Sequence, residues 1–224
     1  MKEVSDNWKA SGNLSYIRHK VRIIAIPILN PWGLSQSPRT RQNSNGVDLN
    51  RNFDVHWPTG SPNPGDHGYR GESPFSEKET QYVRDLILDH PEATSLLDLH
   101  ALGAGRESKG VIYVPRSGDV SNHKEWIKFL KWFVPDDSTY EFNYSINSTC
   151  SNYASIVHGL YASTPEWPAE SWGDSPLDGI EITKATEYFG NIIIMHSKLR
   201  NREKVDASVE PVTFFANYEY SSGN

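Results

Sequence analysis

The feature that most constrains the fold is a nearly continuous apolar run from Val21 to Leu29, with the sequence VRIIAIPIL. A run this rich in β-branched residues predicts a strand that is buried on both faces. The turn-forming residues of the segment 30–33, Asn-Pro-Trp-Gly, end the run. A strand buried on both faces lies inside a sheet that helices cover from both sides. The run therefore predicts an α/β domain.

The rest of the chain alternates between helical and strand patterns, which supports the same class. Helices are expected at residues 1–10 (stopped by Ser11, Gly12 and Asn13), 76–90 (capped by Ser76), 122–133, 152–158 and 183–199. Further strands are expected at 94–100, 111–114 and 160–164. We predict a mixed, twisted sheet sandwiched by helices.

The length of 224 residues suits one domain with a buried core. We expect this domain to span residues 1–200, and residues 201–224 to form a C-terminal extension or an edge hairpin. Residues 34–74 are rich in Ser, Asn, Gly, Pro and Arg and show little periodicity. A loop this long inside a compact domain is usually functional.

Charge and composition limit the kinds of partner. The net charge of −6 argues against nucleic acid, because phosphate binding needs a surplus of Lys and Arg. The sequence has no apolar stretch near the ~20 residues that a membrane span requires, so no membrane partner is expected. A single cysteine, Cys150, excludes an internal disulfide. Cytoplasmic and exported locations are both compatible with these features, and we expect a monomer.

The polar groups best suited to bind a ligand lie in the segment 41–53, RQNSNGVDLNRNF. It places Arg41, Asn50 and Arg51 in a loop after the predicted strand, where ligands of α/β sheets are commonly bound. A guanidinium matches a carboxylate bidentately, and an amide adds a neutral donor. The alternative is that Arg51 pairs with Asp48 or Asp54 on a solvated loop.

Four segments together resemble the M14 family of zinc carboxypeptidases. They are IPILNPWG at 26–33, RQNSNGVDLNRNF at 41–53, YRGESPFSEKET at 69–80 and DLH at 98–100. Their order and spacing agree with the family over roughly residues 20–170. The resemblance implies zinc as cofactor, a peptide with a free C-terminal carboxylate as substrate, and hydrolysis of its C-terminal amide bond.

The resemblance also implies roles for residues of the loop and of the strand at 94–100. Asn50 and Arg51 match the pair that holds the substrate carboxylate, and Arg41 matches the arginine that polarises the scissile carbonyl and stabilises the oxyanion. His100 matches the third zinc ligand, although a histidine at a strand end is often only a satisfied polar residue. Asp98 lies on the same face of the strand and could orient His100.

Two further roles fall near residues 140–170. Glu166 matches the general base and acid of the family, with Glu170 as a nearby competitor. Tyr144 matches the mobile tyrosine that contacts substrate. Tyr140 and Tyr153 are alternatives to Tyr144, and a structural tyrosine is a further one.

The chain departs from the family at its beginning. The family takes its first two zinc ligands from a His-x-x-Glu motif upstream of the Asn-Pro-Trp-Gly turn. This chain has none there, because His19 is followed by Lys20, Val21 and Arg22. We therefore expect a carboxypeptidase domain that lacks its N-terminal part. The alternatives are a non-catalytic module that binds carboxylates or peptides, or a related zinc amidase acting on cell-wall peptides. No residue of this chain indicates which substrate side chain the site would prefer, whether basic, acidic or apolar.

Overall fold

A computed structural model describes residues 6, 9, 12–101, 110–116, 118–120 and 140–167. Its helices are α2 (Gly12–Lys20), α3 (Pro31–Ser35), α4 (Lys78–Asp89) and α6 (Cys150–Asn152), with a 3-10 turn η2 (Leu49–Arg51) and a π-helical turn η3 (Tyr153–Val157). Its strands are β1 (Ser95–Leu97), β2 (His100–Ala101), β3 (Gly110–Pro115), β4 (Tyr140–Ser145) and β5 (Tyr161–Trp167). None of the helices in these described ranges is long and apolar enough to cross a bilayer.

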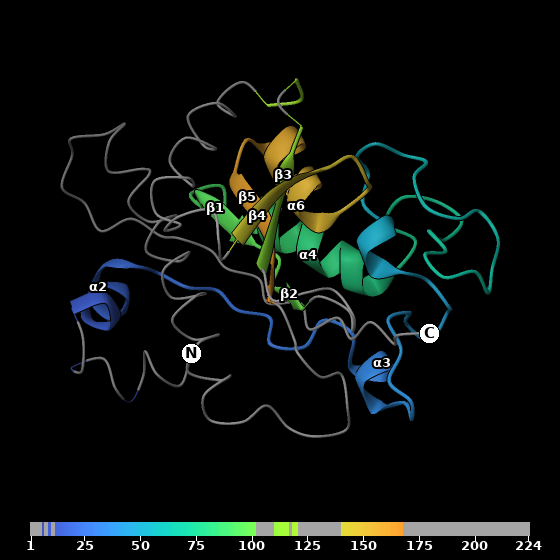
Figure 1. Ribbon diagram of the computed structural model, residues 1–224, viewed down its shortest axis with the longest axis horizontal. Helices are drawn as coiled ribbons and strands as arrows, with labels where there is room; N and C mark the ends of the chain where they lie inside the picture. Colours follow the sequence, from blue (N-terminus) through green and yellow to red (C-terminus); the bar gives the residue numbers. More distant parts are fainter. Residues whose placement is uncertain are drawn as a thin grey trace.

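The strands form one mixed sheet, in which β5 has a central place (Figure 1). The order is β1-β5-β3-β4, and β2 extends the pairing of β1 along β5. The pairs β1–β5, β2–β5 and β3–β4 are parallel, whereas β3 and β5 run antiparallel. This arrangement confirms the predicted α/β class with a mixed sheet.

The core lies between the sheet and the helices α4 and α6. Leu96 of β1 and Ala162 of β5 are fully buried, and Val83 of α4 packs in the same cluster. The ring of Phe53 extends this cluster into the loop 41–75, because it lies 5.7 Å from the ring of Phe75. Apolar burial of this kind is what fixes an otherwise irregular loop against a sheet.

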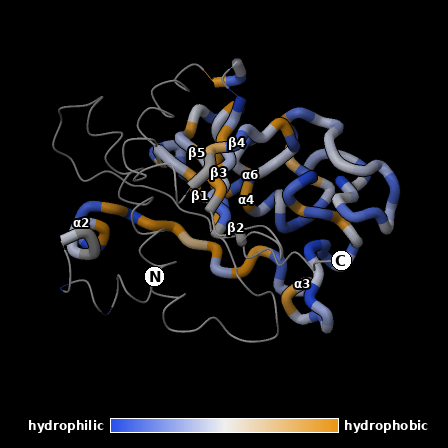
Figure 2. The backbone as a smooth tube through the Cα atoms, in the orientation of Figure 1, coloured by the Kyte–Doolittle hydropathy of each residue, from blue (hydrophilic) through white to orange (hydrophobic). Residues whose placement is uncertain are grey.

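The prediction of a buried strand at residues 21–29 is wrong. The segment is extended and apolar (Figure 2), but among its residues only Arg22 forms a β-bridge. The side chain of Ile28 is 47% exposed, and only Leu29 is buried. Pro27 accounts for part of the difference, because proline cannot donate to a ladder and is confined to edge strands or bulges.

Several predicted boundaries also shift. Gly12 begins helix α2 instead of ending one. Helix α4 starts at Lys78, and its N-cap is Glu77, not Ser76. The strand β4 was not predicted, since its sequence YEFNYS is polar.

The other predictions either agree with the structure or concern residues that it does not describe. The strands expected at 94–100, 111–114 and 160–164 correspond to β1 with β2, to β3 and to β5. The helix expected at 152–158 corresponds to α6 and η3. The helices expected at 122–133 and 183–199, most of segment 1–10, and the extension 201–224 lie outside the described residues.

Candidate functional site

The backbone at Arg41 is held by the turn that follows residues 21–29. The amide nitrogen of Asn30 donates to the carbonyl oxygens of Arg41 and Gln42, each at 3.0 Å. The amide oxygen of Asn30 accepts from the backbone N–H of Gly33 at 2.9 Å. A Cβ on Gly33 would lie 2.4 Å from both Asn30 Nδ2 and the carbonyl oxygen of Thr40, so this close approach requires glycine. The turn therefore fixes the backbone position of Arg41 in the site.

Asp48 is the charged partner of Arg41. Its side chain is only 1% exposed, and its Oδ2 accepts from Arg41 Nε at 2.8 Å. Its Oδ1 accepts from the backbone N–H of Asn50 at 3.0 Å, which begins the turn η2. The sequence left open a pairing of Asp48 with Arg51, and the structure pairs it with Arg41.

The pKa of Asp48 lies below its usual value. Burial alone raises this pKa, because it disfavours the charged form. The nearby guanidinium groups of Arg41 and Arg51, with hydrogen bonds from Arg41 and from the backbone of Asn50, lower it by more. The carboxyl group is therefore ionised, although water barely reaches it.

Asn50 connects the loop to the end of the sheet. Its Nδ2 donates to Asp98 Oδ2 at 3.0 Å, and its Oδ1 accepts from the backbone N–H of Cys150 at 2.8 Å. Both ends of a buried amide are thus bonded within the protein, as burial requires. This linking role was not predicted from the sequence, because its partners lie 48 and 100 residues away.

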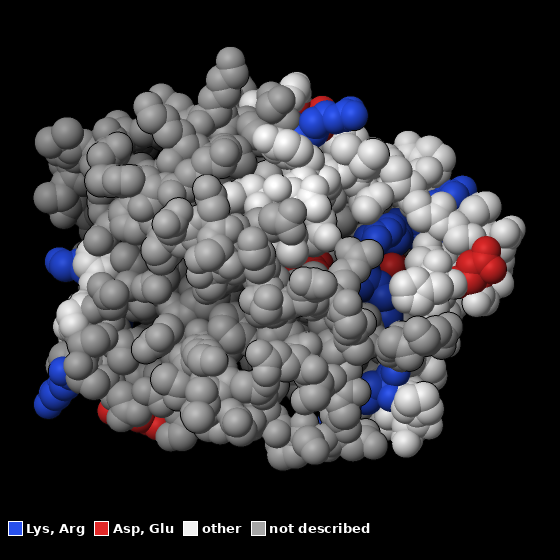
Figure 3. All heavy atoms as spheres, viewed as in Figure 1, with Lys and Arg blue, Asp and Glu red and all other residues white. Residues whose placement is uncertain are grey.

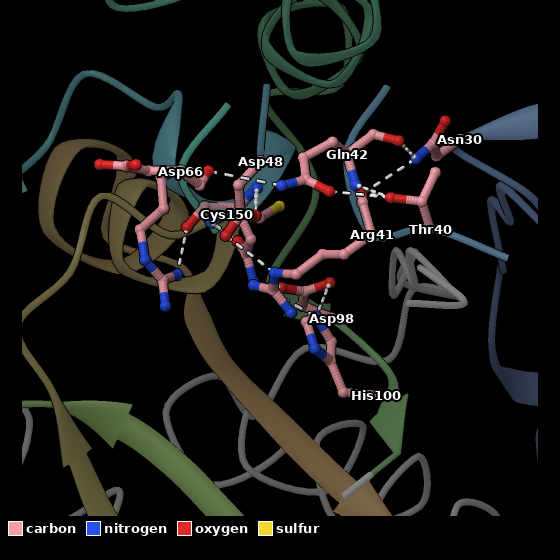
Figure 4. Close-up of polar contacts among 11 residues, drawn as sticks. Asn30, Thr40, Arg41, Gln42, Asp48, Asp66, Asp98, His100 and Cys150 are labelled. Carbon is pink, nitrogen blue, oxygen red and sulfur yellow. Dashed lines mark hydrogen bonds and ion pairs between the residues drawn. The ribbon is translucent and has the colours of Figure 1, made fainter. Parts of the chain in front are cut away.

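His100 and Asp98 lie together at the end of β1 and the start of β2 (Figure 4). The Nε2 atom of His100 is 3.1 Å from Asp98 Oδ1 and 3.2 Å from the amide nitrogen of Asn50. A carboxylate only accepts and an amide NH2 group only donates, so Nε2 cannot bond to both: in the tautomer whose Nε2–H donates to Asp98, the Asn50 contact is not a hydrogen bond and the ring lone pair lies on Nδ1. This is the arrangement by which a carboxylate orients a metal-binding histidine.

Glu166 faces the same side of the sheet as His100. The two residues are register partners on the parallel strands β2 and β5. Paired residues on adjacent strands project their side chains to one face. Glu166 lies within β5, whereas the sequence placed it just after a strand, and its side chain is half-buried. Its competitor Glu170 lies outside the described residues.

Tyr144 lies farther from these groups. It belongs to β4, which the intervening strand β3 separates from β5, and it is 55% exposed. The alternative Tyr140 is in the same strand. Tyr153 is buried, and its ring lies 5.1 Å from that of Phe75, which makes it a core residue.

On the face drawn in Figure 3, Lys and Arg atoms adjoin Asp and Glu atoms in the region where the loops after α3 lie in Figure 1. Arg41 also pairs with Asp48, whose side chain is only 1% exposed.

The described residues do not by themselves make up a zinc site. They contain no group of three or more His, Cys, Asp or Glu side chains that could hold a metal ion. A catalytic zinc usually takes three protein ligands. His100 is the residue that the sequence predicts as one such ligand.

Known proteins resemble this chain in sequence. A family model for zinc carboxypeptidases (M14 peptidases) matches residues 1–108. Human carboxypeptidase O is 26% identical over 186 residues, which cover 75% of this chain and 47% of that protein. Mouse mast cell carboxypeptidase A is 37% identical over 86 residues, which cover 32% of this chain and 20% of that protein. The chain thus spans about half the length of human carboxypeptidase O, and less of the mouse protein.

Solved structures show the same fold. Carboxypeptidase A from Helicoverpa armigera has a TM-score of 0.54 at 23% identity, over 80% of this chain and 50% of that one. Bovine thrombin-activatable fibrinolysis inhibitor, in complex with tick carboxypeptidase inhibitor, has a TM-score of 0.55 at 17% identity, over 70% and 57%. Over residues 1–108 the chain is similar in sequence to the M14 family of zinc carboxypeptidases, and it shares the carboxypeptidase fold.

Proposed function

We propose that this chain carries the carboxylate-binding and proton-transferring groups of a metallocarboxypeptidase, an enzyme that hydrolyses the C-terminal amide bond of a peptide. One observation carries the proposal. A continuous buried network runs from Arg41 through Asp48 and Asn50 to Asp98 and His100, and Glu166 is the register partner of His100 on the adjacent strand.

Arg51 is the proposed anchor for the substrate carboxylate, together with Asn50. Its Nη1 donates to the carbonyl oxygen of Asn50 at 2.7 Å, which holds the guanidinium over the turn η2. A planar fork held in this way can bind both oxygens of a carboxylate. Tyr144 is the proposed third contact with substrate.

Arg41 and Glu166 are the proposed catalytic residues. The bond from Asp48 fixes the plane of the Arg41 guanidinium, and a fixed cation stabilises the negative charge that develops on a carbonyl oxygen under attack. Glu166 would remove a proton from the attacking water and return it to the leaving amine, so that its own charge is restored. Zinc is the proposed cofactor, with His100 as one ligand oriented by Asp98.

A pair of peptide probes tests the anchor. Benzoylglycyl-phenylalanine and its C-terminal amide differ only in the terminal charge. We expect the free acid to bind more tightly in calorimetry, and Arg51→Ala to weaken its binding at least ~10-fold, as expected for a lost charge-assisted bond. Arg18→Ala, on the exposed face of α2, is the control and should change nothing. Equal binding of acid and amide to the wild-type chain would exclude a carboxylate site.

Zinc titration tests the role of His100. If zinc binds the purified chain, His100→Ala should weaken that binding, whereas His90→Ala should not. Zinc that binds equally to the wild-type chain and to His100→Ala would contradict the proposed ligand.

A second candidate function is carboxylate binding without hydrolysis. It is favoured by the absence of a three-ligand group among the described residues. Release of phenylalanine from the free-acid probe in the presence of zinc would support the enzyme. Tight binding of that probe without release would support the binding module.

A further inference from the structure

Asp48 lies between Arg41 and Arg51 in the sequence, and the proposed function gives these two arginines different roles. We propose that Asp48 is a positioning residue that orients Arg41 and Arg51 together and thereby sets the affinity of the site for a carboxylate. The proposal rests on the proposed function for its ligand, but its structural part can be measured on the protein alone.

The two carboxylate oxygens of Asp48 bind different parts of the loop. Oδ2 accepts from Arg41 Nε at 2.8 Å, and Oδ1 accepts from the backbone N–H of Asn50 at 3.0 Å. The carbonyl oxygen of Asp48 accepts from the backbone N–H of Arg51 at 2.9 Å. Asp48 therefore fixes both the side chain of Arg41 and the backbone of Arg51.

Asp48 is itself held firmly. Its backbone N–H donates to the carbonyl oxygen of Tyr69 at 2.8 Å, which ties it to the second part of the loop. Its side chain is 1% exposed, and that of Arg41 is 14% exposed. A buried, bonded carboxylate keeps its partners in one geometry, whereas an exposed ion pair does so poorly.

The charge of Asp48 also acts on both guanidinium groups. Both lie close enough to act on the ionisation of Asp48. Two like charges brought together without a counter-charge would repel each other, and burying one unpaired is costly. The carboxylate offsets this repulsion and leaves the three groups with a net charge of +1, since two positive charges and one negative charge sum to +1.

Charge and positioning predict opposite effects of Asp48→Asn. If Asp48 acted only through its charge, its removal would make the site more positive and tighten the binding of an anion, by about a few-fold because solvent and salt screen the gain. If Asp48 positions the arginines, the same change should weaken binding by about tenfold or more. Each misplaced guanidinium then loses its charge-assisted hydrogen bond to the ligand carboxylate. The sign of the effect decides between the two roles.

Nitrogen-15 NMR of the arginine Nε–H groups tests the positioning directly. In the wild-type chain we expect one Nε–H signal to be shifted and protected from exchange, and to disappear in Arg41→Lys. Asp48→Asn should move that signal to the position of solvated arginines. Asp66→Asn is the matched control, because the Asp66 carboxylate accepts from Ser61 and Asn63 and not from an arginine. An Arg41 signal that is unchanged in Asp48→Asn would overturn the proposal.

Calorimetry with the free-acid probe gives the functional test. We expect Asp48→Asn to weaken binding about tenfold or more, and Asp66→Asn to leave it unchanged. Tighter binding in Asp48→Asn would overturn the positioning role. If the wild-type chain does not bind the probe, the proposed function fails, and the NMR result alone decides whether Asp48 orients Arg41.

A second variant, Asp48→Glu, serves if Asp48→Asn does not fold. Asp48→Glu keeps the charge but displaces the carboxylate by one methylene. Positioning predicts a shifted Arg41 signal and weaker probe binding in this variant too. If both the signal and the affinity match those of the wild-type chain, charge alone is sufficient and the proposal is wrong.

Discussion

Buried polar residues carry most of the organisation of this site. Asp48 and Asn50 are almost completely buried, and each bonds in two directions. Such groups cost free energy when a partner is lost, because the remaining group keeps its desolvation penalty without its bond. The site is thus sensitive even to a substitution of Asp48, which has no proposed contact with substrate.

The lowered pKa of Asp48 predicts how acid affects stability. A carboxyl group whose folded pKa lies below its unfolded value, about 3.9 for aspartate, stabilises the fold above that value. This contribution is lost as the pH falls through the folded pKa. We expect the wild-type chain to exceed Asp48→Asn in unfolding free energy at pH 7, and the difference to shrink below about pH 4.

Urea unfolding from pH 7 to pH 2 measures this difference. Asp66→Asn serves as control, because hydrogen bonds from Ser61 and Asn63 lower the pKa of Asp66 but its carboxylate is exposed. Its difference from the wild-type chain should be smaller at every pH. A difference for Asp48→Asn that stays constant across the range would show that the ionised carboxylate contributes nothing.

At the scale of elements, the site depends on how helix α4 holds the loop 41–53. Glu77, the N-cap residue of α4, is 4% exposed. Its carboxylate accepts from Asn43 Nδ2 at 2.6 Å and from Asn45 Nδ2 at 2.8 Å. Asn43 Oδ1 in turn accepts from the backbone N–H of Val47 at 3.1 Å, one residue before Asp48.

Glu77→Ala should therefore weaken both the fold and the site. We expect a loss of about 1–3 kcal/mol in unfolding free energy, because the buried amide of Asn43 loses its shortest bond and keeps only the longer contacts with Glu79, and Asn45 loses its acceptor. Probe binding should also weaken, since the loop that carries Arg41 and Arg51 loses its attachment to α4. Glu72→Ala, at an exposed position between this loop and α4, is the control for urea unfolding and calorimetry. Equal stability of the two variants would contradict this role of Glu77.

At the scale of the whole molecule, one apolar cluster joins the sheet, two helices and the functional loop. Leu96 of β1 is fully buried in this cluster, together with Val83 of α4 and Phe53 of the loop. The proposed carboxylate site is thus built on the outside of the core that stabilises the described part of the chain.

Truncation in this core should cost much more than truncation on the surface. We expect Leu96→Ala to lower the unfolding free energy by about 2–5 kcal/mol, through lost burial and the cavity that remains. The matched control is Leu88→Ala on α4, because Leu88 is 56% exposed, and we expect a change of about 0.5 kcal/mol or less there. Similar losses in the two variants, measured by urea unfolding, would contradict the cluster as the core.

The sequence by itself determined the α/β class, the helix at 78–89, most of the sheet strands and the resemblance to zinc carboxypeptidases. It also placed Asp98 and His100 on one face of a strand, because alternation along a strand is a local rule. These features depend on patterns over a few neighbouring residues, which the printed sequence contains in full.

Only the tertiary structure decided which groups meet. Asp48 pairs with Arg41 and holds the backbone of Arg51, and Asn50 bonds to partners 48 and 100 residues away. The apolar run 21–29 is half-exposed even though its composition favours burial. The physical reason is the same in each case: bonding and burial depend on the neighbours that folding brings from distant parts of the chain, and a local pattern does not specify them.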